Sequence, residues 1–193
     1  MKLNLGPTDR MYPMPCPLVV GGTMEAADML AVAWIGTAGG TPPSIGMALR
    51  KTRRTLELIR ENGDFTVNIG PTSRAAEIDL CGIVSGHNVD KWELTGLTLE
   101  PSRIVSAPII AQFPYNLECR VTNEVELGEY VFVIGEVIES HAEESILSQD
   151  GKTVDVGLLD PLMYIPGSRE YRGIGPKLAD AYSIGKQFLP PKE

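Results

Sequence analysis

Residues 50–55 place four cations within six positions, at the start of a predicted helix. A helix N-terminus already carries partial positive charge, so each cation there is disfavoured by about 0.3–1 kcal/mol. A bound anion would remove this conflict, with Arg50 and Arg53 supplying charge and Thr52 and Thr55 supplying hydroxyl groups. The segment therefore indicates a phosphate site. The alternative is a solvated basic patch whose long side chains pair with nearby glutamates.

Residues 85–92 form a second candidate anion site. A loop that contains Gly86 can direct backbone N–H groups at an anion, and Ser85 and Lys91 would add a hydroxyl group and a charge. The alternative here is an ordinary surface turn. Trp34, at the end of a predicted buried strand, either lines a flat aromatic ligand or belongs to the core.

No side chain of the sequence stands out as catalytic. His87 and His141 have no metal-ligating residues clustered near them in the sequence, so we expect no metal site. No nucleophile elbow, phosphate-binding P-loop or dinucleotide fingerprint occurs in the chain. This pattern is typical of proteins in which a cofactor carries the reaction.

The bulk properties narrow the function classes further. A length of 193 residues fits a single domain, and we expect a C-terminal extension from about residue 145. The formal net charge of −8 argues against nucleic acid and against an anionic membrane surface as partners. We see no signal peptide or apolar membrane span, and three widely separated cysteines suit a reducing compartment. The expected location is the cytoplasm.

The elements that must position these residues are mostly strands. Apolar and polar residues alternate along residues 117–127, which predicts a half-buried strand, and residues 130–140 return as its hairpin partner. The other predicted strands are residues 17–22, 29–36, 44–50, 64–69 and 162–166, with a turn at residues 39–43. Helices are predicted at residues 52–62, capped by Thr52, and at 73–84 and 177–184, with an irregular loop at 85–95. Together they predict a mainly β (α+β) fold, an antiparallel barrel with short decorating helices.

Taken in order, several segments resemble the flavin reductase-like, FMN-binding split-barrel family, which includes flavoredoxins. The matching segments are residues 15–20, 31–34, 42–45, 53–55, 63–68, 85–86, 90–92, 107–108, 117–119 and 134–137. The resemblance implies a split-barrel homodimer with FMN held near the subunit interface. It also implies that the FMN phosphate meets Arg53, Thr55, Ser85 and Lys91. Asn68 would lie beside the cofactor, and the strand that ends with Ala33 and Trp34 would flank the isoalloxazine ring.

Two positions depart from the family pattern. Trp92 stands where phenylalanine is usual, and His87 stands where arginine is common, which weakens the case for a charge contact at residue 87. The resemblance implies an FMN-dependent oxidoreductase, either an NAD(P)H:flavin reductase or a flavoredoxin-like carrier reduced by another electron-transfer protein. The alternatives are a non-catalytic flavin-binding module and a barrel that binds another phosphorylated aromatic, such as pyridoxal phosphate.

Overall fold

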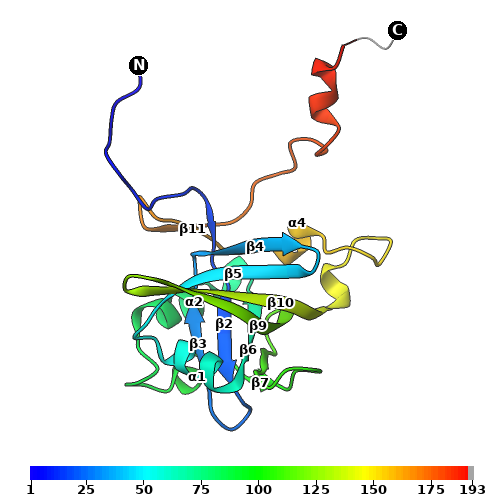
Figure 1. Ribbon diagram of the computed structural model, residues 1–193. Coiled ribbons are helices and arrows are strands. Elements are labelled where there is room, and N and C mark those ends of the chain that lie inside the picture. The colour runs from blue at the N-terminus through cyan, green and yellow to red at the C-terminus, as the bar shows by residue number, and fades with distance from the viewer. Residues whose placement is uncertain (191–193) are drawn as a thin grey trace.

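The main feature of the fold is a seven-stranded antiparallel sheet. The computed structural model describes residues 1–190 and gives the strand order β3-β2-β6-β9-β10-β5-β4 (Figure 1). The strands are β2 (Leu18–Gly22), β3 (Ala27–Ala31), β4 (Ile35–Gly40), β5 (Pro43–Arg50), β6 (Asp64–Ile69), β9 (Tyr115–Leu127) and β10 (Tyr130–Ala142).

The long β9–β10 hairpin joins the two halves of this sheet. Each strand has 13 residues, and β9 pairs with β6 while β10 pairs with β5. Register shifts at Ile134/Gly135 and Val137/Glu139 mark bulges, which bend a sheet and increase its twist. The strands β3 and β4 are the two edge strands of this sheet and do not pair with each other, so the barrel is split rather than closed. The predicted antiparallel split barrel with short helices is confirmed, and the predicted hairpin extends slightly beyond both of its expected outer ends.

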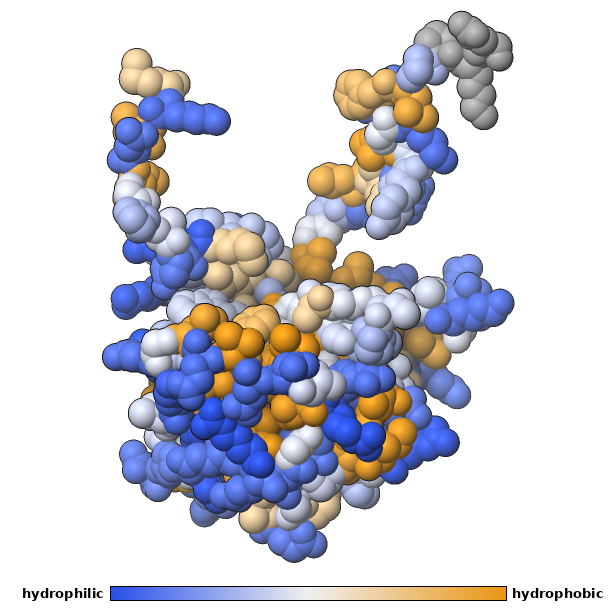
Figure 2. Space-filling view, in the orientation of Figure 1, coloured by the Kyte–Doolittle hydropathy of each residue, from blue (hydrophilic) through white to orange (hydrophobic). Residues whose placement is uncertain are grey.

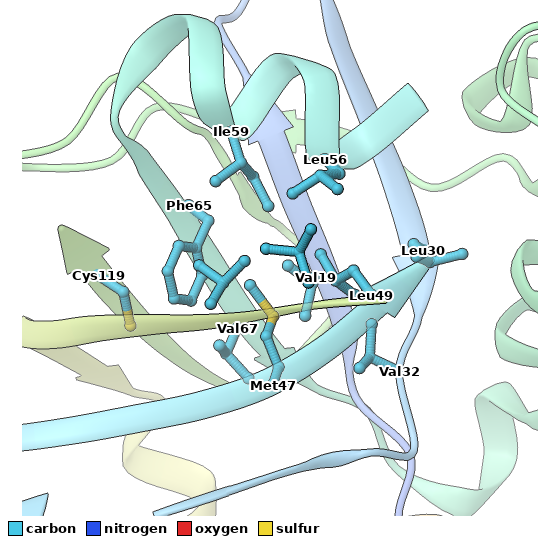
Figure 3. Packing of buried hydrophobic residues seen from close by; sticks show 12 residues of the cluster. Val19, Leu30, Val32, Met47, Leu49, Leu56, Ile59, Phe65, Val67 and Cys119 are labelled. Atoms are coloured by element: carbon cyan, nitrogen blue, oxygen red, sulfur yellow. The ribbon is translucent and has the colours of Figure 1, made fainter. Parts of the chain in front are cut away.

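Helix α1 (Arg54–Asn62) covers the interior of the barrel. Leu56 and Ile59 lie three residues apart on one face and point toward Val19 of β2 and Phe65 of β6 (Figure 3). Full burial of such a side chain contributes about 1.5–3 kcal/mol. The helix approaches β2 so closely that a Cβ on Gly21 would lie 2.8 Å from Ile59 Cγ1, so this position requires glycine.

Helix α2 (Ala75–Ile83) covers the other side of β2. Its Ile78 and Cys81 pack in one cluster with Leu18 and Met29. Because Val19 belongs to the interior cluster, successive residues of β2 are buried on opposite faces. The helix predicted at residues 73–84 is therefore confirmed as α2, preceded by a short 3-10 turn at Thr72–Arg74.

Smaller elements complete the chain. A second sheet has the order β1-β11-β12 and brings the C-terminal β11–β12 hairpin beside the N-terminal segment. These elements are β1 (Met14–Pro15), β7 (Leu99–Glu100), β8 (Ile109–Ile110), β11 (Met163–Ile165), β12 (Glu170–Arg172), α3 (Lys91–Thr95), α4 (Val156–Leu159) and 3-10 turns at Glu144–Ile146 and Ile184–Phe188. The strand predicted at residues 162–166 corresponds to β11.

The prediction of one buried strand over residues 29–36 is wrong. Strand β3 ends at Ala31, and β4 begins at Ile35. Between them the chain leaves its pairing with β2, and the carbonyl of Trp34 accepts a hydrogen bond from Ala48 N at 2.9 Å. The apolar run therefore crosses from one half of the sheet to the other. The predicted turn at residues 39–43 is shorter than expected, because β4 continues through Gly40.

Three predicted helix features also differ. Helix α1 begins at Arg54 with Arg53 as its N-cap, so Thr52 is not the cap. Residues 85–95 are not wholly irregular, because α3 forms behind Asp90, whose carboxylate accepts hydrogen bonds from the N–H groups of Trp92 and Glu93. In place of a helix at residues 177–184, the structure has only the short turn at Ile184–Phe188.

Both ends of the described chain project from the same side of the barrel as extended arms (Figure 1). Each arm carries apolar side chains (Figure 2), among them Leu5, which is 88% exposed, and Phe188, which is 84% exposed. Among residues 1–190, no helix has both the length and the apolar character needed to cross a membrane.

Candidate functional site

Four of the predicted cofactor-binding residues line one groove. Ala33 and Trp34 come from the crossover between β3 and β4, and Arg50 and Arg53 come from the end of β5 and the start of α1. Tyr130, the first residue of β10, completes the wall, and its ring centroid lies 5.0 Å from that of Trp34. The volume of the groove between these residues is about 170 Å³. The split of residues 29–36 into two strands exposes Trp34 here, so this residue does not belong to the core.

The cations of residues 50–54 are not equivalent. Arg50 pairs with Glu129 at 3.2 Å and lies over the ring of Tyr130, and Lys51 pairs with Glu126. Arg54 pairs with Glu57 on its own helix at 3.0 Å. Among residues 1–190, Arg53 has no ion pair. Three of the four cations thus follow the solvated-patch alternative, and Arg53 is left as the charge available to an anion.

Arg53 also stands at the N-terminus of α1, which no side chain within residues 1–190 caps. The first N–H groups of a helix need acceptors, and the helix dipole adds positive potential at this end. The guanidinium and the helix N-terminus therefore favour the same ligand chemistry. An anion at this end of the groove would satisfy both.

A second pocket of about 350 Å³ adjoins this groove. Ala31 and Ala33, on either side of the end of β3, line both pockets. Its other lining residues come from α2 and the β11–β12 hairpin: Cys16, Asp79, Gly82, Ile83, Tyr164, Arg169 and Tyr171. The small side chains at positions 31, 33 and 82 give a floor over which a flat ring can lie.

Thr55 and Lys91 are directed at a carboxylate of the chain itself. Asp28 accepts a hydrogen bond from Thr55 Oγ1 at 2.5 Å and pairs with Lys91 Nζ at 3.0 Å. Asp28 is 7% exposed and Lys91 is 2% exposed. Gly86 packs on the same carboxylate, because a Cβ there would lie 2.2 Å from Asp28 Oδ1. The positive charge of Lys91 is thus balanced within the protein.

The remaining predicted site residues lie apart from the groove. Asn68 is fully buried, and its side chain bonds to Ile110 N, Asn116, Thr66 and the carbonyl of Leu18. Ser85 Oγ accepts a hydrogen bond from His87 N at 3.3 Å. Thr52 is exposed in the turn before α1 and lines neither pocket. The structure therefore brings together Ala33, Trp34, Arg50 and Arg53, and gathers Thr55, Gly86 and Lys91 around Asp28.

The thiols are not suited to nucleophilic chemistry. Burial raises the pKa of Cys16, Cys81 and Cys119 to about 12, so all three stay protonated near neutral pH. Across the described residues, no group of three or more His, Cys, Asp or Glu side chains is arranged to hold a metal ion. The groove therefore offers binding groups, with charge at one end and a flat apolar floor at the other.

Several residues in and around the groove were not anticipated from the sequence. Asp28 could have been found from the sequence, because a single carboxylate beside an apolar run needs a charged or hydrogen-bonding partner if the strand is buried. Tyr130 and the β11–β12 residues carried none, because only the folded sheet brings them to residues 31–34. A second signal was the Asp90–Glu93 spacing, which is typical of a helix start.

Known proteins resemble this chain in both sequence and structure. A model of the flavin reductase-like domain matches residues 10–175. The flavoredoxin of Desulfovibrio vulgaris (Miyazaki F) has a similar structure, with a TM-score of 0.90 and 37% sequence identity over 96% of this chain and 100% of that one. The flavoredoxin of Methanosarcina acetivorans gives 0.91 and 31% over 98% and 100%. A protein of Archaeoglobus fulgidus is 32% identical over 142 residues, which is 74% of this chain and 78% of that protein.

The family match covers all strands of both larger sheets and both pockets of the groove. The observed split barrel and the family resemblance of the sequence segments therefore both agree with the family match over residues 10–175. This chain belongs to the flavin reductase-like family, a family of flavin-binding oxidoreductases.

Proposed function

We propose that the chain binds FMN in the groove, with the phosphate at Arg53 and the N-terminus of α1. The observation that carries this proposal is the Arg53 guanidinium, which has no ion pair within residues 1–190 and stands at a helix N-terminus that no described side chain caps, in a chain whose formal net charge is −8. A phosphomonoester offers Arg53 a bidentate acceptor and offers the helix N–H groups a negative charge. FMN is preferred to a dinucleotide flavin, because residues 1–190 offer one such phosphate position.

The isoalloxazine ring would lie over Ala31 and Ala33. The small side chains there permit close approach, and Trp34 and Tyr130 border one side of the groove. The chain's own groups then bind and orient the ring while the adjoining pocket leaves one edge accessible to a reaction partner. The flavin itself supplies the chemistry, since it accepts a hydride and passes on one or two electrons.

We infer that the electron donor is NAD(P)H or a reduced electron-transfer protein. The test is an absorbance spectrum of the protein after incubation with FMN and desalting, followed by anaerobic NADH and NADPH. We expect the flavin bands to be retained. Bleaching by a nucleotide supports a reductase, whereas bleaching only by dithionite supports a carrier that is reduced by another protein.

Two outcomes of the same experiment would contradict the proposal. If no flavin is retained, the proposal that the chain binds FMN is wrong, and another phosphorylated aromatic ligand is favoured. Incubation with pyridoxal phosphate tests one such ligand directly, because its own absorbance reports binding. Retained flavin that is reduced neither by a nucleotide nor by an electron-transfer protein would favour a non-catalytic flavin-binding module.

All three cysteines are free and buried thiols, and from this we further propose that the protein works in a reducing compartment, the cytoplasm.

We also propose that the protein is a homodimer. The outer side of β4 and β5 carries an apolar pocket of about 450 Å³ lined by Trp34, Phe132 and Met11 of the N-terminal arm. The C-terminal arm exposes Leu178 and Tyr182 almost completely, at 96% and 98%. Apolar side chains this exposed on an extended arm have little to stabilise their position in a monomer, and a second copy would cover them.

Removing residues 174–193 should weaken this dimer. We expect the full chain to sediment at twice 20.9 kDa and the truncated chain to shift toward 20.9 kDa at low micromolar concentration. The change leaves the main sheet and the groove intact, so circular dichroism serves as the control for folding. A full chain that sediments as a monomer with full flavin content would contradict the proposal.

A further inference from the structure

The β11–β12 hairpin presents an unusual cation to the pocket beside the flavin groove. Arg169 lies in the turn of this hairpin and lines the 350 Å³ pocket. Its backbone has φ 57°, the left-handed region, which costs a non-glycine residue about 1–2 kcal/mol. Within residues 1–190 its guanidinium has no ion pair, whereas Arg172 of the same hairpin pairs with Glu170 at 2.8 Å. A strained backbone that presents an unpaired cation indicates a role in binding.

Two tyrosines give this pocket an aromatic wall. The rings of Tyr164 and Tyr171 lie 5.8 Å apart between centroids, and both line the pocket. Tyr171 Oη donates a hydrogen bond to Asp79 Oδ1 at 2.8 Å, which fixes the ring. Burial, with this hydrogen bond, raises the pKa of the Tyr171 hydroxyl, so it remains a donor. Among the described residues, the pocket thus combines a rigid aromatic surface with one cation, Arg169, that has no ion pair.

The charges of this pocket restrict how a ligand can lie. Asp79 also lines it, and its carboxylate would repel an anion placed nearby. An anionic group is therefore stable only at the guanidinium of Arg169, with the uncharged part of the ligand against the tyrosines. A volume of about 350 Å³ is near the lower limit for small-molecule sites, so it suits a ligand of one or two rings.

We propose that this pocket binds a planar aromatic carboxylate, with Arg169 holding the carboxylate and Tyr164 and Tyr171 packing on the ring. A carboxylate fits the planar fork of one arginine. Because the pocket shares Ala31 and Ala33 with the groove, the ligand would lie beside the flavin. That placement rests on the proposed FMN site, whereas the binding chemistry does not.

Equilibrium dialysis of the full chain with radiolabelled benzoate tests this inference, with and without added FMN. Benzamide, which has a similar shape and no charge, should bind at least about tenfold more weakly. Arg169→Gly removes the guanidinium and suits the left-handed backbone, so it should retain the wild-type melting temperature or raise it slightly. We expect this variant to lose at least about tenfold in benzoate affinity while its FMN content stays unchanged. Arg172→Ala is the matched control and should bind benzoate like wild type.

Three results would overturn the inference. Equal binding of benzoate and benzamide would remove the role of charge, and unchanged benzoate affinity in Arg169→Gly would remove the role of this arginine. Loss of FMN from Arg169→Gly would show that the guanidinium contacts the flavin rather than a second ligand. Failure of the FMN proposal can be distinguished from failure of this inference, because dialysis without FMN measures the benzoate affinity of the pocket independently of flavin binding.

Discussion

Replacing Arg53 by alanine is expected to weaken FMN binding by about 1–3 kcal/mol, or about 5- to 150-fold. The reason is the loss of charge-assisted hydrogen bonds to the phosphate, at a position where no glutamate within residues 1–190 already occupies the guanidinium. The effect should decrease as salt rises, because the groove is open to solvent. Fluorescence quenching of FMN during titration at low ionic strength measures it.

Arg54→Ala provides the matched control. Arg54 is the next residue on the same helix, but Glu57 holds its guanidinium at 3.0 Å, and it lines a different pocket with Gly86 and Lys91. We expect this variant to bind FMN within about twofold of wild type, as for a surface ion pair. If Arg54→Ala weakens FMN binding and Arg53→Ala does not, the phosphate lies in that other pocket and our placement of the cofactor is wrong.

The contrast between these two arginines explains how far the sequence could predict the site. The density of cations at residues 50–54 was visible in the sequence and indicated an anion. Glu57 on the same helix occupies Arg54, but Arg50 and Lys51 are occupied by Glu129 and Glu126, which lie more than 70 positions away and reach the segment only because β10 pairs with β5. Local patterns identify a charged segment, and the sheet decides which charge remains available.

The fold was predictable where its signals are local. Alternation along β9 predicted the hairpin, and the helix predicted to end at residue 62 does end there, before Gly63 at φ 75°. The prediction at residues 29–36 was wrong because an apolar run has the same sequence pattern whether it forms one strand or crosses between two. Only contacts with distant strands decide between these cases. That crossover is the segment that forms the floor of the groove. The part of the fold hardest to predict is thus the part that creates the site.

Replacing Asp28 by alanine is expected to lower the free energy of unfolding by about 3–5 kcal/mol. The substitution leaves Lys91, only 2% exposed, with a buried charge and no other carboxylate of residues 1–190 paired with it, and it removes the acceptor of Thr55 Oγ1. Urea denaturation followed by circular dichroism measures the change. Thr23→Ala, at a partly exposed residue of the preceding turn, serves as the control and should lie within about 0.5 kcal/mol of wild type.

The double variant Asp28→Ala/Lys91→Met separates the two roles that Lys91 could have. Replacing a buried ion pair with apolar side chains is often close to neutral, so most of the stability lost in Asp28→Ala should return. If Lys91 serves only to balance Asp28, the double variant also retains FMN with wild-type affinity. A folded double variant that has lost FMN would instead restore Lys91 as a phosphate ligand. Asp28 would then be a group that holds the lysine until the cofactor binds, and the anion site would extend from α1 to the loop before α3.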